Sequence, residues 1–435
     1  MNSLPIPLNN SRVGFHYFQD FLHYREIDQT TWLPRIQELD ASWMIIRAPH
    51  DRAIPEPFIS ALIKNNIEPV IHFDLSLSAP PSIEDLSLLL HTYKNWGIHY
   101  VMLFSRPNLK SSWVTSSWAQ HDLVERFLDR FIPIANAVIR EELIPVFPPL
   151  EPGGDYWDTA FLTSALESMK RRGKNDILDN LVLTASAAFS PNGLNWGAGG
   201  PERWPGARPY FTSDTEEDQR GFYIFEWYNA ISHSILGRTL PTILVNVGNN
   251  SGSFVNKSNF STIFQLLNNE EVIIPESVET KLNSIPDNIV SCCFQLVPTS
   301  PDFENNSNNF YNSEQEPTEI HLSVMQWIHS RKNGQKTRNE PLRENSHPLQ
   351  HYLLLPAYEW GISEWHLDVI KPFVKNHLPT IGFSISEAAL ASKVTVVGGP
   401  QSFSEESLQF LRDSGSTVER ISGDGTSIAS QLAER

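Results

Sequence analysis

The chain has 435 residues, more than one typical domain, so we expect one large domain and one smaller domain. Hydrophobic residues make up 40% of it and charged residues 19%, as in ordinary globular proteins. Its 50 acidic and 33 basic residues give a net charge of −17, which argues against nucleic acids and anionic membrane surfaces as partners.

Export and membrane signals are not evident in the sequence. The first residues, MNSLPIPLNNSRVGF, lack the basic and apolar regions of a signal peptide, and no run of 18 apolar residues occurs. The two cysteines, Cys292 and Cys293, are adjacent in a predicted strand and form no disulfide framework. We therefore expect a protein that does not contact membranes and that lies in the cytoplasm by default, with association to the cell surface as the alternative.

The first 300 residues alternate apolar, strand-like runs with amphipathic segments of helix length. This alternation is typical of repeated βα units around a parallel sheet. We count eight strands, the number that closes a (β/α)8 barrel. The predicted strands are residues 12–17, 43–48, 68–73, 98–104, 144–147, 181–185, 242–246 and 289–296.

Helices are predicted between these strands. Residues 82–85, Ser-Ile-Glu-Asp, resemble a capping box, and residues 120–140 repeat apolar side chains at helical spacing. Residues 222–236 carry an aromatic stripe that we assign to the core, and residues 318–331 would form the eighth helix. The predicted fold class is α/β, with a TIM barrel over residues 1–331.

Two insertions interrupt the regular spacing. Residues 190–218 are rich in Gly, Pro and Trp, so we expect neither helix nor strand there, and they follow the sixth strand on the ligand-facing rim. Residues 300–317 are rich in Asn and Ser and are expected to be mobile.

After the barrel, residues 332–350 read as a polar linker, and residues 351–435 as a small three-layer α/β accessory domain. The predicted strands there are 352–355, 380–383, 394–397 and 417–421, and the predicted helices are 363–375, 386–391, 404–413 and 426–433.

The end of this small domain resembles a single cell-wall-binding type 2 repeat. Residues 394–435 share with such repeats a strand followed by Gly398-Gly399, an acidic helix, and an Arg-Ile-Ser-Gly turn at residues 420–423. The resemblance implies wall binding. The alternative is an α/β accessory domain docked on the barrel.

Residues 101–108, VMLFSRPN, end the fourth predicted strand in polar residues. They resemble the fourth strand of a large clan of (β/α)8 glycosidases, in which an Asn-Glu pair followed by Pro supplies the general acid. The resemblance implies a barrel that handles carbohydrate. Here the pair is Ser105-Arg106, and an arginine cannot protonate a leaving group at neutral pH.

The seventh strand allows a second test of this resemblance. Retaining members of the clan place a nucleophilic Glu there, whereas this chain has Asn246 and Val247, neither of which can form a glycosyl intermediate. We therefore expect that the usual retaining mechanism is missing.

Other carboxylates follow the third and fifth strands. Asp74, Glu151 and Asp155 are the catalytic candidates if the protein is active, because an inverting mechanism needs only two carboxyl groups about 6.5 to 9.5 Å apart. The alternative is that Glu151 and Asp74 pair with Arg106 and Arg47.

Candidate ligand-binding residues lie at several strand ends and in the Trp-rich insertion. Aromatic rings there can stack on sugars while polar groups bind hydroxyls. The alternative is that the loop tryptophans are buried and anchor the long loop. The strand ends also present His16, Arg47 and Ser186. The candidates are His72, Arg106, Asn108, Asn246, Trp157, Trp196, Trp204 and Arg203.

Cofactor and metal signatures are weak. The histidines are scattered over separate elements without the local spacing of metal ligands, and neither a G-x-S-x-G elbow nor a dinucleotide fingerprint occurs. We predict neither a metal nor a cofactor.

The functional hypothesis is a glycosidase-like barrel that recognises carbohydrate without the usual retaining mechanism, acting as a glycan-binding or scaffold protein. Its partner would be a glycan or oligosaccharide. One alternative is an active glycoside hydrolase that uses Asp74 with Glu151 or Asp155. A second alternative is a purely structural or assembly protein.

Overall fold

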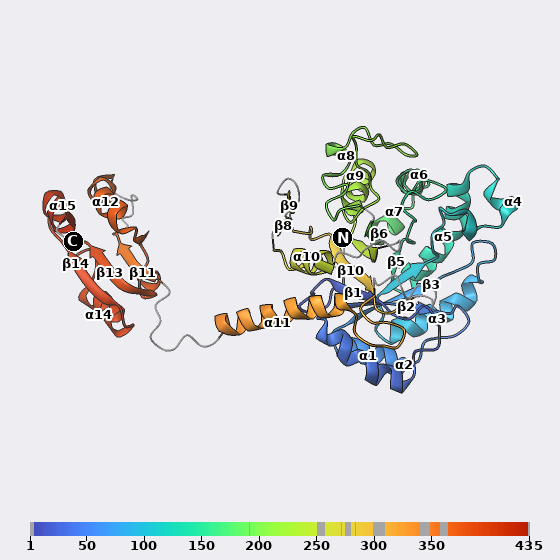
Figure 1. The fold of residues 1–435 in the computed structure, drawn as a ribbon, viewed down its shortest axis with the longest axis horizontal. Helices are drawn as coiled ribbons and strands as arrows, with labels where there is room; N and C mark the ends of the chain where they lie inside the picture. Colours follow the sequence, from blue (N-terminus) through green and yellow to red (C-terminus); the bar gives the residue numbers. More distant parts are fainter. Residues whose placement is uncertain are drawn as a thin grey trace. The chain divides into compact units, whose positions relative to one another are not determined.

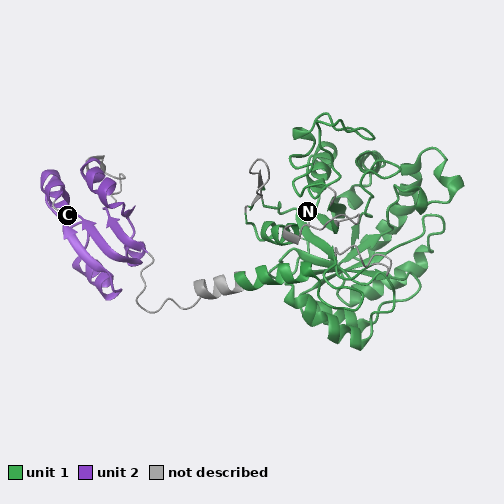
Figure 2. Cartoon of the chain, in the orientation of Figure 1, with its two compact units in different colours: residues 1–330 green, residues 331–435 purple. Residues whose placement is uncertain are grey.

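The computed structural model divides the chain into two compact units, Met1–Ser330 and Arg331–Arg435 (Figure 2). We describe each unit by itself. The structure describes residues 4–433 except 191, 250–256, 271, 275–279, 283, 299–308, 340–348 and 357–363. Much of the insertion at residues 300–317 therefore lies outside the described residues.

The first unit is a closed barrel of eight parallel strands. The sheet order is β5-β4-β3-β2-β1-β10-β7-β6, and a parallel bridge between Val146 and Val182 joins its two ends. The amide of Phe147 donates to the carbonyl of Val182 at 2.8 Å across this seam. The predicted barrel is thus confirmed. Its strands are β1 (Val13–His16), β2 (Trp43–Ala48), β3 (Glu68–Phe73), β4 (Tyr100–Leu103), β5 (Ile144–Val146), β6 (Leu183–Ser190), β7 (Thr242–Asn249) and β10 (Ile289–Gln295).

Helices cover the outside of the strands (Figure 1). The sequence explains where these helices begin and how they pack. The Ser82 hydroxyl accepts from the Asp85 amide at the start of α3, and ten buried residues line the inner face of α5. The longer helices are α1 (Glu26–Glu38), α2 (Glu56–Lys64), α3 (Ile83–Asn95), α5 (Leu123–Arg140), α6 (Asp158–Arg171), α9 (Ile224–Leu236), α10 (Lys257–Leu267) and α11 (Glu319–Asn339).

Several boundaries differ from the prediction. The insertion after β6 contains a short helix, α8 (Gly200–Arg203), which starts after Gly199 at a φ of 92°. An antiparallel hairpin of β8 (Val272–Ile274) and β9 (Thr280–Leu282) was not predicted. The helix predicted to end at residue 331 continues to Asn339 as α11.

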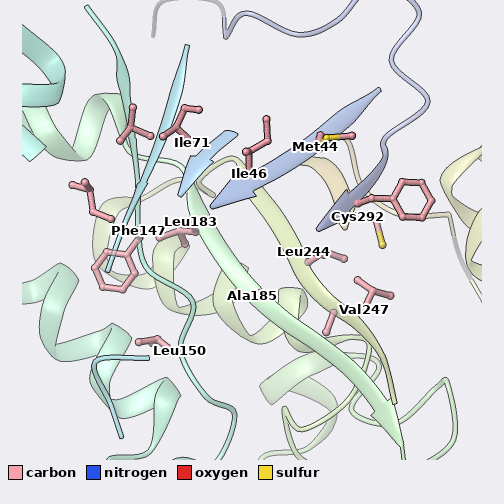
Figure 3. Packing of buried hydrophobic residues seen from close by; sticks show 14 of the residues in the cluster. Met44, Ile46, Ile71, Phe147, Leu150, Leu183, Ala185, Leu244, Val247 and Cys292 are labelled. Carbon is pink, nitrogen blue, oxygen red and sulfur yellow. The ribbon is translucent and has the colours of Figure 1, made fainter. Parts of the chain in front are cut away.

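Buried residues form two layers in the barrel. Trp43, Tyr100 and Cys293 belong to a cluster drawn from most of the strands, which therefore fills the barrel interior. Cys292 and Val247 belong instead to the larger cluster between strands and helices (Figure 3). The adjacent cysteines thus face opposite sides of β10, as period-two alternation requires.

The second unit is a four-stranded parallel sheet in the order β12-β11-β13-β14. One buried cluster joins the sheet to α14 and a second joins it to α12 and α15, so helices cover both faces. The helix predicted at residues 386–391 is shorter, because β13 begins at Ala391. The elements are β11 (Leu349–Leu354), α12 (Glu364–His377), β12 (Thr380–Gly382), α13 (Ile385–Ala388), β13 (Ala391–Val397), α14 (Glu405–Asp413), β14 (Thr417–Ile421) and α15 (Gly425–Ala433).

Within the described residues, every helix is too short or too polar to cross a bilayer. The resemblance of residues 394–435 to a wall-binding repeat stays a prediction.

Candidate functional site

Polar side chains from β1, β6, β7 and β10 meet at the carboxyl end of the barrel. The amide N–H of Asn246 donates to His16 Nε2 at 3.1 Å. The Asn246 side chain accepts from the Gln295 amide at 3.1 Å and donates to the Ser186 hydroxyl at 3.4 Å. Together with His72 of β3, we call these residues the barrel mouth. It lies where ligands bind in barrels of this type.

A β-bulge directs Asn246 into the mouth. Leu244 pairs with Cys292 and Val247 pairs with Phe294, so β7 has one residue more than β10 in this interval. Asn246 takes the left-handed conformation at a φ of 51°, while Val247 is 1% exposed and belongs to the outer core. Bulges of this kind re-aim side chains next to functional sites. The residue that β7 presents to the mouth is therefore a neutral amide.

The end of β4 is also unusual. Phe104 and Arg106 have φ values of 64° and 43°, and such left-handed residues other than glycine cluster at ligand sites. His72 Nε2 lies 2.9 Å from the Phe104 carbonyl oxygen, and the Arg106 amide donates to the Pro149 carbonyl. Residues other than glycine thus take the left-handed conformation at the ends of both β4 and β7.

Burial keeps the two mouth histidines neutral. It lowers the pKa of His16 to about 3, with a further contribution from the nearby His72, and it lowers the pKa of His72. The Asn246 amide can only donate, so His16 Nε2 is unprotonated and its Nδ1 carries the hydrogen. The Phe104 carbonyl can only accept, so His72 carries its hydrogen on Nε2. The mouth therefore offers one donor, His16 Nδ1–H, and one acceptor, His72 Nδ1.

The three candidate carboxylates each contact a cation. Asp74 pairs with Arg47 at 2.6 Å, and Arg47 also donates to the Gln19 carbonyl. Glu151 lies 3.5 Å from Arg106, whose side chain is 52% exposed.

Asp155 accepts from the backbone amide of Lys110 at 2.8 Å and lies 3.6 Å from its ammonium group. The catalytic roles assigned to Asp74, Glu151 and Asp155 stay predictions.

The candidate residues of the loops make contacts within the loops. Asn108 is fully buried, and its side chain bonds the backbone of Glu151 and Tyr156, which joins the loops after β4 and β5. Trp157 is 8% exposed, and its ring lies against Tyr210 and under the Arg220 guanidinium.

The other two tryptophans donate their indole N–H groups inside the long insertion. Trp196 donates to Asp218 at 3.2 Å and Trp204 donates to the Ala198 carbonyl at 3.0 Å. The Arg203 guanidinium lies 5.0 Å from the Trp204 ring centre. These contacts anchor the insertion, and a stacking role for the rings stays a prediction.

Gln295 is the mouth residue that was not predicted. It ends β10 between Phe294 and Leu296, and a lone polar residue within an apolar run was the available signal. Among the described residues, we find no group of three or more His, Cys, Asp or Glu side chains that could hold a metal ion.

The lowered pKa of His16 predicts a pH-dependent stability. Unfolded His16 binds a proton below about pH 6.5 whereas folded His16 does not. The contribution of His16 to stability is therefore fully present above pH 6.5 and is lost as the pH drops toward 3. Between pH 7 and pH 5, protonation of this histidine in the unfolded state should lower the free energy of unfolding by about 2 kcal/mol. His16→Gln keeps an acceptor and does not titrate, so urea unfolding at both pH values should show a pH dependence smaller by that amount. His50→Gln, at an exposed position after β2, is the control and should keep the original dependence.

Comparison with known proteins shows similarity of fold. No family model and no curated protein matches the chain. Similar solved structures include a monomeric β-xylosidase from Caulobacter crescentus (TM-score 0.44, 11% identity, 73% of this chain and 68% of that chain). A GH39 enzyme from Xanthomonas axonopodis pv. citri has a TM-score of 0.45 and 12% identity over 75% of this chain and 67% of that chain. A GH128 endo-β-1,3-glucanase from Sorangium cellulosum has a TM-score of 0.38 and 11% identity over 72% of this chain and 96% of that chain. These likenesses concern the fold and assign no activity to this protein.

Proposed function

We propose that the barrel mouth binds a carbohydrate and that the protein lacks the retaining glycosidase mechanism. The observation that supports this is the neutral pair of histidines. His16 Nδ1–H and His72 Nδ1 have no hydrogen-bond partner in the described part of the chain, and one donates while the other accepts. A sugar hydroxyl both donates and accepts, so it matches such a pair.

The lack of a retaining mechanism rests on Arg106 and Asn246. They occupy the two strand ends where a retaining enzyme needs carboxyl groups about 5 to 5.5 Å apart, and neither side chain can act as acid or nucleophile. Arg106 is half exposed beside the mouth, where its guanidinium can donate to hydroxyls.

An active hydrolase is the second candidate. Its support is the contact between Glu151 and Arg106, which is long and partly solvent-exposed, and such ion pairs are weak. Glu151 is therefore free to move toward a bound sugar, with Asp74 or Asp155 as its partner carboxylate.

Glycan-array screening of the whole chain, followed by calorimetry on retained oligosaccharides, tests the proposal. His72→Ala should lower affinity by about tenfold, the loss of roughly 1.4 kcal/mol expected when a buried ligand hydroxyl loses its acceptor. His91→Ala, an exposed histidine on α3, is the matched control and should change nothing.

The alternatives give different results. Turnover of aryl glycosides or polysaccharides that Asp74→Asn or Glu151→Gln abolishes would identify a hydrolase. Absence of any retained glycan would contradict the proposal and favour a structural or assembly protein.

A further inference from the structure

A groove of 1030 Å³ lies outside the barrel, between α1 and α2 and the loops that precede them. Its volume matches that of small-molecule sites, and no residue of the barrel mouth lines it. The walls are largely apolar and include three aromatic rings and three prolines. Among them are Phe21, Leu33, Phe58, Pro49, Pro55 and Pro57.

A small cavity beside the groove is lined by a residue whose polar group is unsatisfied. Leu33, Phe58 and Gln29 also line a small cavity of 10 Å³ that extends to Tyr17 and Trp32. The Tyr17 hydroxyl is buried and has no hydrogen-bond partner among the described residues. A buried hydroxyl without a partner costs about 1 to 3 kcal/mol, and the cavity has room for about one water molecule or ligand oxygen.

The lining of the groove is cationic in an acidic protein. Its lining contains Arg25, Arg52 and Lys64 against one acid, Glu26, whereas the chain carries a net charge of −17. Arg25 is held by Asp28 at 2.9 Å. Arg52 and Lys64 form no ion pair with any residue that the structure describes, so their charges are available to a ligand.

We infer that this groove binds an amphipathic organic anion. The apolar body of the ligand lies against the prolines and Phe58, where removal from water drives binding. Its carboxylate lies toward Arg52, before α2, or Lys64, at the end of α2, because each cation can form charge-assisted hydrogen bonds with an anion. The site is separate from the mouth, and the inference does not depend on carbohydrate binding.

Calorimetry of the full chain with octanoate and 1-octanol tests the inference, since the two probes share a chain length and differ in charge. Octanoate should bind at least tenfold more tightly. Arg52→Gln/Lys64→Gln should weaken octanoate about tenfold and leave octanol within twofold. Arg140→Gln/Lys94→Gln, which removes two cations from other surfaces, should leave both affinities unchanged.

A second variant locates the site. Ala61→Phe fills the groove from a partly exposed position of α2 and should abolish binding of both probes, while His72→Ala at the mouth should not affect them. Equal affinity for the two probes, absence of octanoate binding, or binding that survives both groove variants would overturn the inference. An acidic, apolar peptide that displaces octanoate more effectively than any small anion would also overturn it in favour of a protein partner.

Discussion

Gly14→Ala is expected to destabilise the barrel severely. A Cβ atom at this position of β1 would lie 2.7 Å from the Cys293 sulfur and the Ser291 hydroxyl oxygen, and 2.9 Å from Trp43 Cβ. Ser291 and Cys293 belong to β10 and Trp43 to β2, so the clash comes from both neighbouring strands. The Trp43 Cβ cannot rotate away. Overpacking of this kind costs about 3 kcal/mol or more, which urea unfolding of the full chain would measure.

Two further variants separate this clash from the general effect of adding a methyl group. Gly399→Ala places its Cβ in open space in the second unit and should change stability by less than about 0.5 kcal/mol. Cys293→Ala removes one of the three clashing atoms, so the loss caused by Gly14→Ala should be smaller in that background. Strictly additive losses would show that the sulfur does not limit the space.

The barrel strands could be predicted because most of them are apolar runs with sharp polar ends. Residues 43–48 are apolar apart from Arg47 and are followed by Pro49, and the predicted strand matches β2 at both ends. The end of β6 was missed, since residues 185–190 are mostly Ala and Ser, which have little strand preference. The β8–β9 hairpin was missed because no alternating pattern marks it.

Two of the candidate site positions could be singled out from the sequence alone. Arg106 and Asn246 stand out because each differs from the glutamate expected at that strand end from the resemblance to the glycosidase clan. The bond between Gln295 and Asn246 was not predictable, because it depends on a bulge and therefore on the register between β7 and its neighbours. The sequence also left open whether the loop tryptophans stack on ligands or anchor their loop. The indole hydrogen bond of Trp196 depends on residues about twenty positions away.

Asp158→Ala is expected to cost about 3 kcal/mol or more and to loosen the loops that flank the mouth. Asp158 is fully buried at the start of α6, where it accepts from the Gly153 amide at 2.8 Å, the Gln219 amide at 2.7 Å and the Tyr228 hydroxyl at 3.1 Å. Alanine would leave the buried donors of Gln219 and Tyr228 and the partly buried Gly153 amide without a partner, and each buried donor costs roughly 1 to 3 kcal/mol.

Asp158→Asn tests whether shape or charge matters at this position. Burial raises the pKa of Asp158, so its charged form is disfavoured in the folded protein, and an amide that keeps an acceptor should cost less than about 1 kcal/mol. Asp179→Ala, which breaks an exposed ion pair with Arg238, is the matched control and should cost about 0.5 kcal/mol or less.

Urea unfolding gives the stabilities, and the rate of limited proteolysis within residues 192–222 measures how firmly this loop is held. Because Gln219 ties this loop to α6 through Asp158, faster cleavage in Asp158→Ala alone would show that one buried carboxylate holds the rim of the barrel in place. Equal cleavage in all three variants would show that Asp158 does not hold this loop in place.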